Sequence, residues 1–231
     1  MKKHFLLTIV LILFFTGINA QEKRMYIGNG LSAPFTETPG YYKQTTFYDS
    51  FWNMESGFKY GKMIMVNDSV VDNLGLRYNL SRDRFEAIFG SHKGIFIAND
   101  SVVKYISMMG ESFTNYRYLD SDGILTKGYF KIIGDGKTQL LFKKTEIHKQ
   151  GKKGAYGHDA SKVFKNNYYL KIPGRPYPVK VKLRKKDILN ALQYKGPRLE
   201  VYAKEHHLWF SKENDLVSIL AYYDKLKSEA H

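Results

Sequence analysis

The 231-residue chain contains no cysteine. This excludes disulfide bonds, thiolate catalysis and cysteine-ligated metal sites together. Beyond residue 15 the sequence also lacks any apolar run approaching the roughly 20 residues that span a bilayer. Stability must therefore come from packing in the hydrophobic core, for which 18 tyrosines and 15 phenylalanines supply much of the material.

The familiar sequence motifs of catalysis are missing as well. The chain has no Walker loop, no G-x-G-x-x-G fingerprint, no G-x-S-x-G elbow and no H-E-x-x-H motif. The run Asp120-Ser121-Asp122-Gly123 begins like a calcium loop but lacks the downstream acidic ligand, so we interpret it as a turn. We assign no catalytic residue and expect no metal and no cofactor. An acid and a base that meet only in the folded chain would leave no such trace.

The N-terminus has the order of a secretory signal peptide. Lys2 and Lys3 precede the apolar run 5–15, and small residues stand at Gly17 and Ala20. We predict cleavage before Gln21 and export to the periplasm or cell envelope. The alternative is an uncleaved anchor helix, but the apolar run is shorter than the roughly 20 residues that such a helix needs. The mature chain is then expected to have no transmembrane segment.

Positive charge is concentrated in one part of the chain. Residues 143–204 hold 17 basic and four acidic residues, whereas residues 21–142 are nearly balanced. Such a field attracts an anionic polymer or an acidic membrane surface. The alternative is a solvated basic surface without a ligand. Because export separates the protein from nucleic acid, we expect no nucleic-acid partner.

Short apolar runs separated by turn residues predict a mainly β, α+β fold. After an extended, aromatic-rich lead-in segment at 21–57, residues 58–147 form an antiparallel β meander that closes as a barrel or a sandwich. Residues 148–160 read as a mobile loop, and 161–231 as a basic hairpin with C-terminal helices. The strands we predict are Phe58–Val66, Val70–Tyr78, Arg84–Phe89, Gly94–Ala98, Val102–Met108, Ser112–Tyr118, Gly128–Ile133, Gln139–Ile147, Val163–Ile172 and Tyr177–Leu183.

One short sequence occurs twice. Asn67-Asp68-Ser69 is followed by two valines, and so is Asn99-Asp100-Ser101. Asparagine, aspartate and serine favour tight turns, so we interpret the echo as one hairpin turn used twice. Two copies do not make a repeat protein.

The candidate binding residues lie in the predicted strand 177–183 and just after it. Lys180, Lys182 and Arg184 alternate with Val179, Val181 and Leu183. Alternate residues of a strand point to the same face, so these three cations should line one face. They are our candidate anion-binding site.

Helical spacing marks the last part of the chain. We predict helices at Lys185–Tyr194, ended by Gly196-Pro197, at Arg198–Trp209, and after an N-cap at Ser211. In the last of these, four apolar side chains recur at helical spacing and should form a buried stripe. They are Leu216, Ile219, Leu220 and Tyr223.

Several short motifs resemble those of a family of uncharacterised exported proteins of Gram-negative bacteria. The block from Gly61 to Val71, followed by Leu76-Arg77-Tyr78-Asn79-Leu80, resembles the family's strand, turn and second strand. The resemblance extends to the tail at 168–170, 185–189, 213–217 and 222–223. It implies export and supplies no catalytic residues.

These features favour an exported, non-enzymatic binding or structural protein of the periplasm or cell envelope. Two alternatives remain at this stage. One is an exported hydrolase whose acid and base meet only in space. The other is a small outer-membrane β-barrel, against which the short strands and polar C-terminal helix count.

Overall fold

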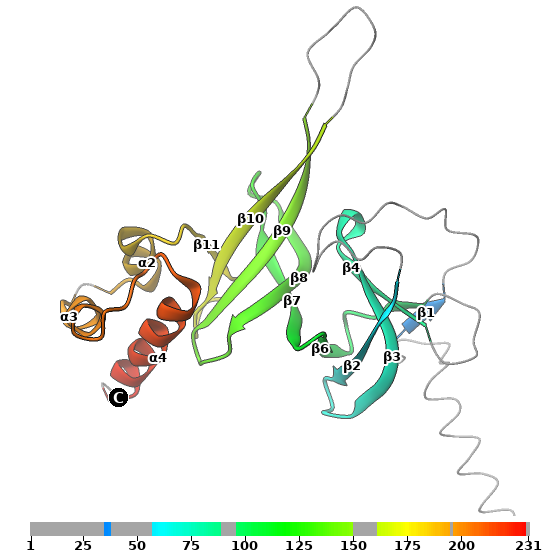
Figure 1. Ribbon diagram of the computed structural model, residues 1–231, viewed down its shortest axis with the longest axis horizontal. Helices are drawn as coiled ribbons and strands as arrows, with labels where there is room; N and C mark the ends of the chain where they lie inside the picture. Colours follow the sequence, from blue (N-terminus) through cyan, green and yellow to red (C-terminus); the bar gives the residue numbers. More distant parts are fainter. Residues whose placement is uncertain (1–34, 38–56, 89–95, 150–160, 195, 230–231) are drawn as a thin grey trace, which may run out of the picture.

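A computed structural model describes residues 35–37, 57–88, 96–149, 161–194 and 196–229 (Figure 1). The strands are β1 (Phe35–Glu37), β2 (Lys59–Met65), β3 (Val70–Asn79), β4 (Arg84–Ile88), β5 (Phe96–Ala98), β6 (Val103–Met108), β7 (Glu111–Leu119), β8 (Leu125–Gly134), β9 (Gln139–Lys149), β10 (Ser161–Lys171) and β11 (Val179–Val181). A 3-10 turn η1 (Leu80–Arg82) and helices α2 (Lys185–Leu192), α3 (Arg198–Glu205) and α4 (Glu213–Glu229) complete the described part.

The strands form one sheet, ordered β1-β5-β4-β3-β2-β6-β7-β8-β9-β10-β11, in which every pair is antiparallel. The predicted mainly β, α+β fold is confirmed. The sheet does not close on itself, because β1 and β11 are its two edges within the described residues. Two connections join strands that are not neighbours in the sheet. Strand β1 lies beside β5 although β2 follows it in the chain, and the chain leaves β5, beside β4, and returns as β6 on the far side of β2.

Alternating burial explains why these segments are strands. In β3 the side chains of Leu74, Leu76 and Tyr78 are buried, and those between them are less so. One face of the strand therefore enters the core while the other meets solvent. A bulge in β2 at Gly61–Met63 bends the sheet here. A Cβ on Gly61 would lie 2.5 Å from the Ser107 carbonyl oxygen, so glycine permits the close approach to β6.

The ladder between β6 and β7 is short. It has three residue pairs, next to a tight turn at Met109 and Gly110, which both have positive φ. Beyond these pairs the strands separate, and side chains of β7 form hydrogen bonds with the backbone of β6 in place of the ladder. The Thr114 hydroxyl donates to the Lys104 carbonyl at 3.1 Å, and the Asn115 amide donates to the Val103 carbonyl at 3.3 Å. We call this region the sheet junction.

Three groups of buried side chains follow from this geometry. The first core is enclosed by β2–β8 and contains Phe85, Phe113 and Tyr129. On β8, Tyr129 enters this core while its neighbour Phe130 joins a small aromatic group on the opposite face. A further core lies between β9–β11 and the helices. One sheet thus contributes to two main cores, and Figure 1 shows the strands and helices that enclose them.

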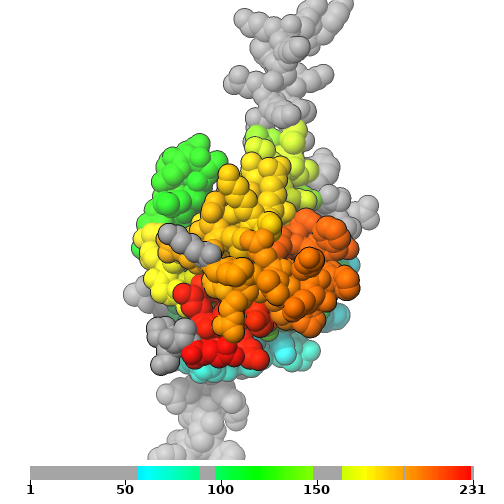
Figure 2. Space-filling model, turned by 90° about the vertical axis from the view of Figure 1, so that its left-hand side faces the viewer, coloured from blue at the N-terminus to red at the C-terminus, as the bar shows by residue number. Residues whose placement is uncertain are grey.

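The helices cover one face at the C-terminal end of the sheet, and their residues occupy most of the view in Figure 2. The predicted stripe of α4 is confirmed: Leu216, Ile219, Leu220 and Tyr223 are all buried. Helix α4 approaches β8 closely at Gly134, where an added Cβ would lie 2.7 Å from Val217. Glycine at this point lets the helix rest on the strand.

The ends of the helices differ from the predictions. Helix α2 ends at Leu192 because Gln193 adopts a left-handed conformation with φ 53°, before Gly196 is reached. Helix α3 ends at Glu205 rather than Trp209, and His207 just beyond has φ 54°. Helix α4 begins at Glu213, two residues after the predicted cap Ser211. Non-glycine residues in this conformation leave little signal in a sequence.

The repeated sequence forms the same local turn twice. The Asn67 carboxamide accepts a hydrogen bond from the Ser69 amide at 3.1 Å, and Asn99 accepts one from Ser101 at 3.0 Å. The first copy joins neighbouring strands β2 and β3. The second joins β5 to β6, which are not neighbours, so its interpretation as a hairpin turn was wrong. Asparagine fixes the turn, but not where the next strand goes.

Some predictions lie outside the described residues. They include the signal peptide at 1–20, most of the lead-in segment 21–57 and residues 150–160 of the predicted loop. Strand β9 continues to Lys149, and β10 pairs with it over eleven residues. Strands β10 and β11 therefore belong to the same sheet as the preceding strands. Within the described part of the chain, no helix combines the length and apolarity needed to cross a membrane.

Candidate functional site

The predicted cationic row is exposed, but only its first member lies in a strand. Lys180 is in β11, where Val181 beside it is buried. Lys182 follows the strand, and Arg184 is the N-cap residue of α2. The backbone turns here, because the Arg184 amide donates to the Lys182 carbonyl at 2.7 Å. The strand is thus shorter than predicted, and the anion-binding role of the three residues remains a prediction.

A groove of about 600 Å³ lies between β11 and α2. Lys180 and Lys182 line it, whereas Arg184 does not. Its strand side is formed by Arg175 and residues 179–182. Its helix side is formed by Asp187, Asn190, Ala191 and Gln193. The structure therefore brings two of the three predicted residues together with Arg175, which we did not predict.

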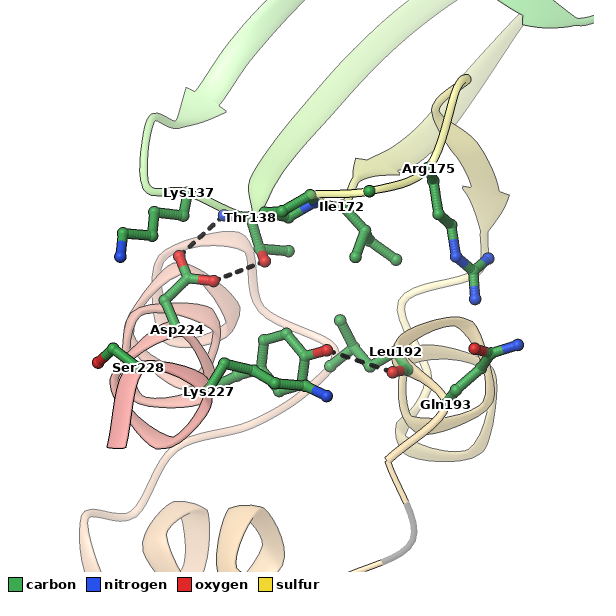
Figure 3. Close-up of a pocket in the computed structure, with 12 residues that line it drawn as sticks. Lys137, Thr138, Ile172, Arg175, Leu192, Gln193, Asp224, Lys227 and Ser228 are labelled. Atoms are coloured by element: carbon green, nitrogen blue, oxygen red, sulfur yellow. Dashed lines mark hydrogen bonds between the residues drawn. The ribbon is translucent and has the colours of Figure 1, made fainter. Parts of the chain in front are cut away.

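A second depression of about 760 Å³ adjoins the groove and shares Arg175 and Gln193 with it. Figure 3 shows it between the β8–β9 turn, the β10–β11 turn and helices α2 and α4. Three buried side chains contribute apolar surface to its lining: Ile172, Leu192 and Tyr223. Its charged groups are Lys137, Arg175, Asp224 and Lys227.

The acidic group of this depression is already engaged. The carboxylate of Asp224 accepts hydrogen bonds from the Thr138 amide at 2.8 Å and the Thr138 hydroxyl at 2.6 Å (Figure 3). These bonds tie α4 to the turn before β9. Within the described residues the structure shows no ion pair for Lys137, Arg175 or Lys227. The depression therefore offers mainly positive charge to a ligand.

We call the two adjoining depressions the basic cleft. Its cations are Lys137, Arg175, Lys180, Lys182 and Lys227. The turn that carries Arg175 begins with a hydrogen bond from its amide to the Ile172 carbonyl at 3.1 Å. The Lys171 ammonium also donates to the Arg175 carbonyl, at 2.7 Å. The backbone that presents the guanidinium group is thus fixed from both sides.

A buried polar cluster lies near the sheet junction. The Lys143 side chain on β9 is only 3% exposed, and its ammonium group pairs with the Asp83 carboxylate. It also donates to the Tyr129 carbonyl at 3.0 Å. The other Asp83 oxygen accepts from the Tyr78 hydroxyl and, at 3.1 Å, from the Tyr129 amide. We call these four residues the Asp83–Lys143 cluster.

Burial shifts the ionisation of this cluster. Desolvation lowers the pKa of Lys143, and Asp83 opposes that shift. The pKa of Tyr78 is raised, first by burial and then by the negative charge of Asp83. The strand β8 can lie against the pair because position 128 is glycine. An added Cβ there would be 2.7 Å from the Lys143 ammonium nitrogen and would collide with the Asp83 carboxylate.

A small pocket of about 310 Å³ borders the cluster and is lined in part by Tyr78, Asp83, Tyr118 and Lys143. Perturbed ionisable groups beside a pocket are a common feature of active sites. Here, however, both Asp83 oxygens already accept hydrogen bonds from within the chain. Tyr78, Tyr129 and Lys143 together use three of the roughly four acceptor positions of this carboxylate, so the arrangement fits a structural anchor better. Sequence analysis missed the cluster, and its one local signal was a glycine inside the strand β8.

The remaining polar candidates do not assemble into sites. The Asp120 carboxylate accepts from the amides of Asp122 and Ile124, both at 2.9 Å, as expected for a turn. Among the residues that the structure describes, no group of three or more histidine, aspartate and glutamate side chains could hold a metal ion. His206 lies against the Tyr202 ring, with 4.4 Å between the ring centroids.

Comparison with protein-family models, with curated proteins and with solved structures gives no match to this chain. Function must therefore be argued from the sites themselves.

Proposed function

We propose that this is an exported, non-enzymatic binding protein of the periplasm or cell envelope, and that its basic cleft takes an anionic polymer. The observation that carries the proposal is the charge of the cleft. Five cations gather around two adjoining depressions, and one of the two acids, Asp224, is held by Thr138. The other acid, Asp187, lies in the first turn of α2, where the helix dipole favours it.

The arrangement of these cations suits a long ligand better than a small one. Small-molecule sites enclose most of a ligand in one cavity with converging polar groups. Here the charges follow an open path from Lys182 and Lys180, past Arg175, to Lys227 and Lys137. Residues two apart on an extended chain are roughly 7 Å apart, which matches repeating charges on a polymer. Affinity should then fall steeply with salt, because each contact releases counterions.

The hydrolase alternative has one observation in its favour, the pocket beside the Asp83–Lys143 cluster. The hydrogen bonds of Asp83 count against it, as described above. We therefore assign the cluster a structural role and place the function in the basic cleft.

The test is retention on heparin, a soluble polyanion, over a salt series. We expect Lys180→Ala/Lys182→Ala/Arg184→Ala to elute at lower salt than the wild type. The matched control is Lys59→Ala/Lys62→Ala/Arg117→Ala, which removes the same charges from exposed positions on β2 and β7. Equal elution of the two variants would show that only net charge matters, and would overturn the proposal. So would failure of the wild type to bind at low salt.

Single variants sharpen the test. Arg175 borders both depressions, whereas Arg184 borders neither. We therefore expect Arg175→Ala to reduce the slope of log affinity against log salt by about 1, and Arg184→Ala to leave it nearly unchanged. If Arg184→Ala reduced the slope more than Arg175→Ala, the binding surface would lie outside the cleft.

A further inference from the structure

Strand β11 is an open edge of the sheet. It pairs with β10 through three residues, Val179–Val181, and within the described residues no strand pairs with its other side. An edge strand presents a row of backbone N–H and C=O groups that another extended chain can pair with. Lysine residues often protect such edges from pairing; here Lys180 lies in β11 and Lys182 directly follows it. Lysine repels other basic chains but attracts acidic ones.

The groove beside this edge is lined by an extended segment and by a helix. Its strand side is formed by the consecutive residues 179–182. Its other side is formed by Asp187, Asn190, Ala191 and Gln193, which follow one face of α2 and the turn after it. The groove is thus bounded by a strand along one side and a helix along the other. This is the setting in which proteins bind peptides by strand addition.

The charge of the groove indicates which kind of peptide it would bind. Lys180, Lys182 and Arg175 line the groove against one carboxylate, Asp187. The buried Val181 and partly buried Val179 alternate with the lysines. A strand added at this edge would place every second side chain beside the lysines and the others beside the valines. The complementary sequence alternates acidic with β-branched residues.

We infer that the β11 edge binds an extended acidic peptide segment as an additional strand of the sheet. This inference rests on the proposed function, since it names the anionic polymer that the cleft takes. Polysaccharides and membrane surfaces would use the same cations but not the backbone of β11. The backbone contribution therefore separates a peptide from other polyanions.

The experiment compares two synthetic peptides of alternating glutamate and valine, acetylated and amidated at their ends. In the second peptide every valine is N-methylated, which removes backbone donors and leaves the charge unchanged. We expect N-methylation to weaken binding at least about tenfold, by fluorescence anisotropy. The unmodified peptide should also slow amide hydrogen exchange in Val179–Val181.

Protein variants complete the design. Lys180→Glu/Lys182→Glu should abolish binding of the unmodified peptide, whereas Lys59→Glu/Lys62→Glu on β2 should retain it. Unchanged circular dichroism would confirm that both variants fold. Equal affinity for the two peptides overturns the inference. If heparin still binds through Lys180 and Lys182 in that case, the proposed function stands. If neither peptide nor heparin depends on these lysines, both proposals fail.

Discussion

Replacing Lys143 by methionine tests whether the Asp83–Lys143 cluster anchors the fold. Methionine keeps most of the side chain that packs against Tyr118 and Phe130, whose ring centroids lie 5.3 and 5.1 Å from the ammonium nitrogen. What is lost is the charge that faces the Asp83 carboxylate. Removing one partner of a buried ion pair costs about 3–5 kcal/mol because the other charge stays behind. Asp83 is 28% exposed, so water offsets part of this cost, and we expect about 2–3 kcal/mol.

The assay is urea unfolding at neutral pH, followed by circular dichroism. The cycle includes Asp83→Asn and the double variant. Asp83→Asn should cost more than Lys143→Met, because it leaves an ammonium group that is only 3% exposed. The double variant should be more stable than the sum of the single losses predicts, with a coupling of about 1–2 kcal/mol. Strictly additive losses would refute the anchor.

Gly128→Ala perturbs the same cluster without altering a charge. The added methyl group would push against both Asp83 and Lys143, so we expect the variant to be destabilised as well. In the Lys143→Met/Asp83→Asn background the effect should shrink, since the pair is no longer there to be forced apart. An equal cost in both backgrounds would mean that Gly128 serves the strand alone.

The remaining predictions concern pH, the helical core and export. Burial is the main cause of raised pKa values in seven described tyrosines: Tyr78, Tyr116, Tyr118, Tyr129, Tyr168, Tyr169 and Tyr223. The pKa values of Tyr168 and Tyr169 rise to about 12. Their contribution to stability is complete below the ordinary tyrosine pKa of 10 and is lost as the pH rises through the raised pKa values. Alkaline unfolding should therefore accompany the rise in tyrosinate absorbance. Ionisation of all tyrosines near pH 10 with the fold intact would contradict this. The lowered pKa of Lys143 acts in the opposite direction, but it is one group against seven. Leu220→Asp places a carboxylate in the core between α4 and the sheet, where Leu220 is 2% exposed. The substitution should lower the free energy of unfolding by about 3 kcal/mol or more. An unchanged thermal midpoint would exclude this packing. Mass spectrometry of exported protein should show a chain that begins at Gln21, and a chain beginning at Met1 would contradict the predicted cleavage.

Local periodic patterns in the sequence predict secondary structure directly. Alternation such as that around Val179 and Val181, and the helical stripe that includes Leu216 and Leu220, predicted most strands and all three described helices. Contacts between distant residues leave no such pattern. Asp83 and Lys143 are 60 residues apart, and only the folding of β9 past η1 brings them together. Arg175 was likewise not predicted to line the groove with Lys180 and Lys182, because it lies in a turn outside the alternating pattern.

The sheet junction also marks where the chain could be divided. A break in the Met109–Gly110 turn would cut only a connection beside three ladder pairs and would leave every other strand pair intact. The first fragment would nevertheless lack Phe113 and Tyr129, which belong to its core. It would also lose Lys143, the partner of Asp83. Two fragments separated at this turn would therefore need each other to fold, and their reassembly would report on the interface between the two halves.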